Sequence, residues 1–154
     1  GWNASSFGVA QDTLYFGGPG SLVVADTGAE DGANAILADC RQAFSYFGSR
    51  GRTKLPHMLR PILAISGPAV IAVGVDTDYA HNATLADQTI SGGTGDPWGG
   101  LWSAPWSQGA TVYRRWFGVS GEGFALAPRL RTATDGVDLT WSATDVVYED
   151  GGRL

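Results

Sequence analysis

A chain of 154 residues with a formal net charge of −5 is long enough to bury a real core, and its length favours one domain, or one domain with a fragment of another. The acidic balance argues against an ordinary nucleic-acid-binding protein, because affinity for DNA comes mainly from clustered Lys and Arg side chains that neutralise phosphates. No apolar run approaches the roughly 20 residues that span a bilayer, and no signal segment opens the chain, so we expect no membrane span.

Residues 1–26 predict a β-hairpin. Two short apolar segments, Thr13–Phe16 and Leu22–Ala25, are joined by "GGPG", and glycine adopts the positive φ angles that tight hairpin turns need. The whole chain contains 23 glycines, and most of its apolar residues come in short runs rich in β-branched and aromatic side chains. This composition favours strands and turns over long helices, so we predict an all-β fold.

Between residues 27 and 79 the sequence predicts three more strands. Apolar and polar residues alternate within Ile36–Phe47, as in a half-buried strand. Leu59–Ile65 and Val70–Val75 follow as a pair split by a Gly-Pro turn. Pro61 is expected at a sheet edge or a bulge, because proline cannot donate a ladder hydrogen bond. Cys40 has no disulfide partner in the chain and is expected to be a buried strand thiol rather than a reactive or metal-binding one.

A tryptophan-rich loop is predicted as an insertion at about residues 80–110. In "DPWGGLWSAPWSQG" the indoles of Trp98, Trp102 and Trp106 are four residues apart, but interspersed Pro and Gly residues disfavour a helix. Three indoles exposed in an irregular loop would leave a large apolar surface in water, so we expect another surface to bury them. A neighbouring subunit could cover them, the loop could fold back over its own sandwich, or the indoles could form a flat platform for sugar rings.

The rest of the chain completes an antiparallel β-sandwich of residues 27–154. Short strands with a turn every ten or so residues are typical of a sandwich or barrel. The last four predicted strands are Val112–Val119, Phe124–Leu130, Val137–Trp141 and Val146–Tyr148.

No motif predicts catalysis, a cofactor or a metal site. The two histidines, His57 and His81, lie outside any nucleophile motif, and the glycine turns lack the Lys-Ser/Thr of a phosphate cradle. Asp76 and Asp78 could offer oxygen ligands to calcium, but without a complete calcium loop we interpret them as solvated acidic turns. We therefore expect no enzymatic activity.

A basic turn, "GSRGRTK", contains Arg50, Arg52 and Lys54, which are candidates for contacts with a partner. Arg129 and Arg131 alternate and so share one strand face. Spacing does not place these residues on one continuous groove, so we interpret them as solvated residues or as ion pairs between subunits rather than as DNA contacts.

Five motifs occur in a distinctive order: an aromatic-Gly strand end, an Asp-Thr-Gly, an Asp-Gly loop, a strand ending in Phe-Gly, and a basic turn into a Lys-x5-Arg-Pro strand. They fall at Phe16–Gly17, Asp26–Gly28, Asp31–Gly32, Phe47–Gly48 and Lys54–Pro61. The chain then ends with two Trp strands around a Gly-x-Gly turn, followed by Tyr-Glu, Gly-Gly and a terminal Leu. This pattern resembles the C-terminal region of propeller-type tail hub or nozzle structural proteins of short-tailed bacteriophages, and it covers nearly the whole chain.

The resemblance implies a non-enzymatic virion protein of the phage tail. Residues 1–26 would be the end of a propeller blade, and residues 27–154 the β-sandwich. The expected partners are other copies of the chain and neighbouring tail proteins, assembled in a ring through which packaged DNA passes without sequence-specific binding. The chain departs from its longer relatives by lacking most of a propeller, so it is either a fragment or a short homologue.

The alternative function is a carbohydrate-binding β-sandwich module whose surface tryptophans Trp98, Trp102 and Trp106 stack on sugar rings. Both functions use the same fold, and they differ in partner and stoichiometry. A carbohydrate-binding module is expected to act as a monomer, whereas an assembly component needs neighbours.

Overall fold

The computed structural model describes residues 4–18, 20–25, 34–91 and 110–153. These residues form antiparallel strands and no helix, which confirms the predicted all-β class. Accordingly, the described part of the chain has no helix that could cross a membrane. The strands are β1 (Ser6–Ala10), β2 (Thr13–Gly18), β3 (Ser21–Val24), β4 (Ile36–Arg41), β5 (Arg52–Ile65), β6 (Ala69–Thr77), β7 (Asp87–Ile90), β8 (Thr111–Arg114), β9 (Phe117–Gly118), β10 (Leu126–Thr134) and β11 (Leu139–Arg153).

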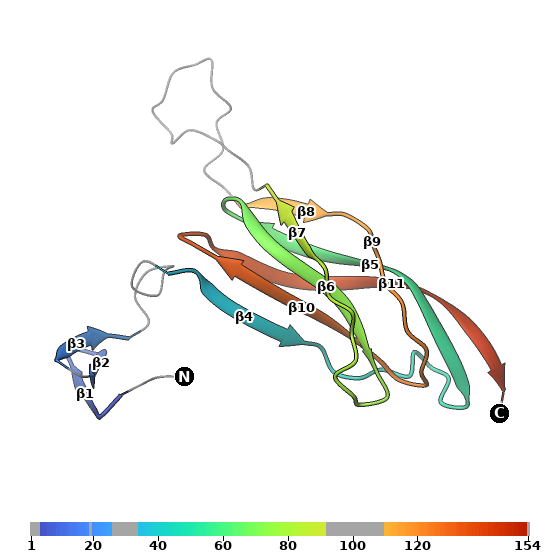
Figure 1. The fold of residues 1–154 in the computed structure, drawn as a ribbon, viewed down its shortest axis with the longest axis horizontal. Helices are drawn as coiled ribbons and strands as arrows, with labels where there is room; N and C mark the ends of the chain where they lie inside the picture. The colour runs from blue at the N-terminus through green and yellow to red at the C-terminus, as the bar shows by residue number, and fades with distance from the viewer. Residues whose placement is uncertain (1–3, 19, 26–33, 92–109, 154) are drawn as a thin grey trace, which may run out of the picture.

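The first three strands form a separate sheet in the order β1-β2-β3, drawn in blue in Figure 1. The predicted hairpin is its second half: β2 and β3 pair up to Gly18 opposite Ser21, and Gly20 in the turn has a φ of 76°. The prediction missed β1, which joins β2 through Gln11 and Asp12, both with positive φ. Two successive residues of this kind make a type I′ turn, which usually contains Asn and Gly.

Residues from 34 onward form two facing sheets, as predicted for a sandwich (Figure 1). One sheet has the order β4-β10-β6-β7, and the other has the order β11-β5-β8, with β9 also paired to β5. In the first sheet β4 and β7 are the edge strands; in the second, β11 lies at one edge and β8 and β9 at the other. The hydrophobic core lies between the two sheets and consists mainly of Leu59, Leu63, Ile65, Ile71, Val73, Val75, Ile90, Phe117, Leu126 and Leu130.

Several predicted boundaries are wrong, and backbone pairing explains why. β4 ends at Arg41 rather than at Phe47, because it meets Pro128 of β10, which has no N–H to continue the ladder; pairing resumes one residue out of register at Ser45. The two predicted strands at the end of the chain are one strand, β11, with a bulge at Ser142. β7 lies inside the range predicted to be a loop.

Pro61 lies in the central strand β5 rather than in an edge strand, which corrects the expectation. β8 and β9 pair with β5 in one common register, in which Ile62 faces Arg114 and Leu59 faces Phe117. The ladder is interrupted between these two pairs, at Arg60 and Pro61. Because proline has no N–H to donate, a strand paired here would have a carbonyl without a donor, and the interruption avoids this.

Gly74 on the outer face of β6 allows the β6–β7 connection to cross the strand closely. A Cβ atom built at Gly74 would lie 2.9 Å from the carbonyl oxygen of Thr84 and 2.8 Å from the Cδ2 atom of Leu85. The first contact is with backbone, which cannot rotate away. Gly74 therefore fixes how tightly this connection packs against the sheet.

Replacing Gly74 with Val is expected to lower the free energy of unfolding by roughly 1–3 kcal/mol, because the added atoms overpack this crossing. The matched control is Gly118→Ala in β9, where a Cβ would meet nothing within 4 Å. Urea denaturation of both variants measures the difference. Equal stability of the two variants would contradict the packing assigned to Gly74.

Candidate functional site

The predicted tryptophan platform lies outside the described residues. Trp98, Trp102 and Trp106 fall between Ile90, where β7 ends, and Thr111, where β8 begins. Their role as an interface, a lid or a sugar platform stays a prediction.

The three candidate basic contacts do not form one surface. Lys54 is fully buried, and its Nζ atom donates to the carbonyl oxygens of Ser49 at 2.6 Å and Phe124 at 2.9 Å, and also to that of Arg52. Arg52 forms a long ion pair of 3.7 Å with Asp150. Arg50 is exposed, and no described residue forms an ion pair with it. Among the three, Arg50 alone has a guanidinium free for an anionic partner.

Three further arginines of the sandwich surface, Arg60, Arg129 and Arg131, form ion pairs within the chain. On the outer face of the first sheet, Arg129 donates to both carboxylate oxygens of Asp39 at 2.8 and 2.6 Å. Arg131 pairs with Asp87 at 2.9 Å. On the second sheet, Arg60 binds Asp145 and stacks 4.7 Å from the ring centroid of Trp116. These side chains therefore hold neighbouring strands together.

Asp76 and Asp78 are structural residues and not simply solvated acids. Asp76 is fully buried and accepts hydrogen bonds from the backbone N–H groups of Asn82 and Ala83, while Arg41 approaches its other oxygen at 3.4 Å. Asp78 accepts from the N–H groups that precede β10, at 2.8 and 3.0 Å. The described residues contain no cluster of three His, Cys, Asp or Glu side chains suited to a metal ion.

Aromatic rings and arginines gather in the loops at the end of the sandwich where β4 and β6 finish. Tyr79 lies 4.5 Å from Phe44 between ring centroids, and its hydroxyl donates to that of Tyr46 at 3.2 Å. The guanidinium of Arg41 lies 5.0 Å from the Phe44 ring, and that of Arg50 lies 5.1 Å from the Tyr46 ring. We call these five residues the loop-end cluster. Tyr, Phe and Arg are the residues that enrich protein interfaces and their hot spots.

Tyr79 is presented at the tip of a strained turn. Asp78 has a φ of 49° and Tyr79 a φ of 64°, and the N–H of Ala80 donates to the carbonyl of Thr77 at 3.0 Å. For a side chain as bulky as tyrosine, the left-handed conformation costs about 1–2 kcal/mol. The side chain nevertheless remains 63 % exposed. Backbone strain of this kind is often found at functional positions.

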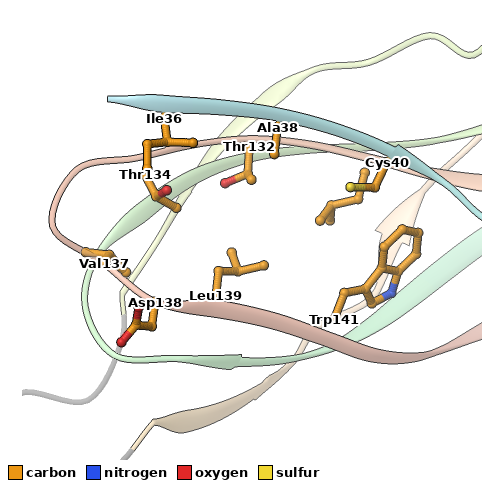
Figure 2. Close-up of a pocket in the computed structure, with 10 residues that line it drawn as sticks. Ile36, Ala38, Cys40, Thr132, Thr134, Val137, Asp138, Leu139 and Trp141 are labelled. Atoms are coloured by element: carbon orange, nitrogen blue, oxygen red, sulfur yellow. The ribbon is translucent and has the colours of Figure 1, made fainter. Parts of the chain in front are cut away.

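An apolar groove of about 340 Å³ opens between the edge strands β4 and β11, and Figure 2 shows side chains from both strands turned toward it. Ile36, Ala38 and Cys40 face it from β4, and Leu139 and Trp141 face it from β11. The Nε1 atom of Trp141 is already satisfied by the carbonyl of Ala143 and the hydroxyl of Thr144. We call this the open-edge groove; it is also lined by Leu130, Thr132, Thr134, Val137 and Asp138.

Cys40 was expected to be buried, but it is exposed in the open-edge groove. Alternation does turn it toward the inside of the sandwich, as predicted. The facing sheet ends at β11 among the described residues, so the inner face of β4 is uncovered at this edge. The prediction of a strand at Cys40 is confirmed. The expectation that Cys40 is buried is wrong, because it assumed that the facing sheet covers the whole of β4.

Sequence reasoning missed both surfaces. The groove follows from the order of strands in two sheets, which no local pattern encodes. The turn that presents Tyr79 has Asp-Tyr where type I′ turns usually have Asn-Gly, and so carries no recognisable signal. The alternation at Phe44 and Tyr46 was visible, but these rings belong to a loop and not to a strand.

Comparisons with protein families, curated proteins and solved structures found no match to this chain.

Replacing Lys54 with Met is expected to lower the free energy of unfolding by about 1–3 kcal/mol, because it leaves three partly buried carbonyl oxygens without their charged donor. The control is Arg52→Met, which removes a half-exposed ion pair worth about 0–1 kcal/mol. Thermal and urea unfolding of both variants checks the prediction. A Lys54 variant as stable as the Arg52 variant would mean that the ammonium does not tie these loops together.

The Asp39–Arg129 pair makes stability depend on pH. Hydrogen bonding from Arg129 lowers the pKa of Asp39 below its ordinary value of 3.8. A lowered folded-state pKa means that the pair stabilises the fold above the unfolded-state value, and that this stabilisation is lost as the pH falls through the folded-state value.

The variant Asp39→Asn is therefore expected to be less stable than the parent at neutral pH, by no more than about 1 kcal/mol because the carboxylate is partly exposed. The difference should shrink as the pH falls below about 3.8. Asp135→Asn, an exposed change outside the ion pairs of the described residues, is the control for loss of a carboxylate. Urea denaturation at several pH values measures both; a constant penalty for Asp39→Asn would contradict the assignment.

Proposed function

We propose that this chain is a non-enzymatic structural component of a larger protein assembly, and that the assembly is a bacteriophage tail. The phage part of the proposal rests on the sequence resemblance to tail hub and nozzle proteins. The assembly part rests on surfaces of the described residues that a free monomer would leave uncovered.

The observation that carries the assembly role is the exposed N-terminal sheet. Residues opposite one another across strands share a face, so Phe7, Val9 and Val23 lie on one face, while Leu22 and Val24 lie on the other. Phe7 is 63 % exposed and Leu22 is 74 % exposed. A three-stranded sheet with apolar residues on both faces is not expected to be stable in water alone, and needs a cover on each face.

The sandwich adds a second argument for assembly. Its edge strands β4 and β11 leave backbone N–H and C=O groups unpaired beside the apolar open-edge groove. Exposed edges of this kind invite pairing with another chain. Assembly partners would cover both the N-terminal sheet and this side of the sandwich.

The proposal is tested in virions. Antibodies raised against the purified chain are expected to label the tails of phage particles released by cells that carry its gene, and peptides of the chain should appear in the protein content of purified particles. A capsid protein of the same particles serves as the control for purity. Particles that lack the chain would overturn the tail assignment.

The same protein is also applied to a glycan array. Strong glycan binding, abolished when Trp98, Trp102 and Trp106 are all replaced by Ser, together with absence from particles, would favour the carbohydrate-binding function instead. Since the assembly function needs no glycan, a featureless array is the expected result.

A further inference from the structure

The loop-end cluster lies at one end of the sandwich, and the open-edge groove runs along β4 from Cys40, next to Arg41 of the cluster, toward the other end. β6 and β10 are antiparallel, with Val70 opposite Ala133 and Thr77 opposite Leu126. Tyr79 follows the Thr77 end of this pair, whereas Val137 and Asp138 follow the Ala133 end. One molecule therefore carries a projecting aromatic cluster at one end and an apolar groove that reaches the other end.

The size and polarity of the groove suit an aromatic ring such as that of Tyr79. The cluster projects the exposed ring of Tyr79, stacked on Phe44. The groove has a volume of about 340 Å³, which falls in the range of small binding pockets and is large enough for an aromatic ring. Its wall is mostly apolar, supplied by side chains such as Ile36, Val137 and Leu139.

The two surfaces are also complementary in charge. Arg50 in the cluster is an exposed cation with no ion-pair partner among the described residues. Asp138 lies at the rim of the groove, where its backbone is fixed by hydrogen bonds with Ser66 and its exposed carboxylate forms no ion pair with the described residues. A cation beside an aromatic knob and an anion beside an apolar groove favour one orientation of docking.

We propose that the loop-end cluster of one copy docks in the open-edge groove of a second copy, with Tyr79 in the groove and Arg50 beside Asp138. The proposal rests on the assembly role proposed above and names the contact that would build the assembly. Because the two surfaces differ, the contact is heterologous: each copy keeps one free cluster and one free groove. Repetition of such a contact gives a closed ring or an open filament, and not a closed dimer.

The turn at Tyr79 offers a variant in which relief of backbone strain offsets the loss of the ring's contacts with Phe44 and Tyr46. Tyr79→Gly replaces a strained left-handed residue with the residue that best adopts that conformation. The variant should unfold cooperatively near the parent temperature, but associate roughly tenfold or more weakly, as expected for loss of an interface hot spot. Val112→Thr, which removes an exposed apolar side chain of β8 away from both surfaces, should associate like the parent. Sedimentation velocity over a range of protein concentrations measures association.

Charge exchange tests the pairing of Arg50 with Asp138. Arg50→Asp and Asp138→Arg should each weaken association, and the double variant should restore it, because the pair is then re-formed with reversed polarity. A parent chain that stays monomeric at all concentrations would overturn the proposal. Association that is insensitive to Tyr79→Gly, or a double variant as weak as the sum of the single ones, would overturn it too.

Cross-linking tests the geometry directly, since Cys40, the chain's single cysteine, lies in the groove. Ala80→Cys places a thiol beside Tyr79, so mild oxidation should link Cys40 of one copy to position 80 of the next and give a ladder beyond the dimer. Adding Cys40→Ala should reduce the ladder to at most a dimer, and Ala10→Cys should give no such ladder. A ladder that persists without Cys40 would contradict the proposed contact.

The outcomes separate this proposal from the proposed function. A chain that is present in tails but neither associates nor cross-links in these experiments would retain the tail assignment and lose this contact. A chain that associates through Tyr79 but is absent from virions would retain the contact and lose the tail assignment.

Discussion

The arrangement of the sandwich depends on the long central strand β5. Over Arg52–Ile65 it pairs with β11 on one side and with β8 and β9 on the other. Its alternate residues Leu59, Leu63 and Ile65 are fully buried against the other sheet. Because a strand has a period of two, the registers in which these strands pair with β5 decide which side chains of β8, β9 and β11 turn inward. The core and both edges of the second sheet follow from it.

Buried charge fixes the loops at one end of this framework. Lys54, in β5, binds carbonyl oxygens from the loops on both sides of it, and Asp76, in β6, binds backbone N–H groups of the β6–β7 connection. Each charge satisfies backbone groups that no strand partner could reach, which offsets the cost of burying it. Loops tied in this way can present Tyr79 in one orientation. A rigid aromatic side chain loses little conformational entropy on binding, so such a surface suits recognition.

Local pattern predicted most of the strands but not where pairing stops. The apolar run Val70–Val75 after the Gly-Pro turn was identified as a strand, and glycine identified the turn between β2 and β3. The ends of strands depend on their partners: β4 ends opposite Pro128, a residue almost ninety positions further along the chain, and the single strand β11 tolerates a bulge at Ser142 because β5 runs unbroken beside it. The loop-end cluster likewise depends on contacts between segments distant in sequence. Those relations are set by the tertiary fold, so no window of sequence contains them.

The open side of the sandwich follows from unequal sheets. β4 extends the first sheet past β10, but the second sheet ends at β11, and no further described strand covers the inner face between them. Ile36 and Cys40 are therefore inward by alternation and yet exposed. Natural sheets commonly protect such edges with charges, bulges or an added cover. Here the bulge in β11 distorts one edge, while Asp39 and Arg41 of β4 pair with residues of β10 and β6 in their own sheet. The charges of β4 thus reinforce its sheet and leave the groove apolar, an arrangement better suited to a partner than to solvent.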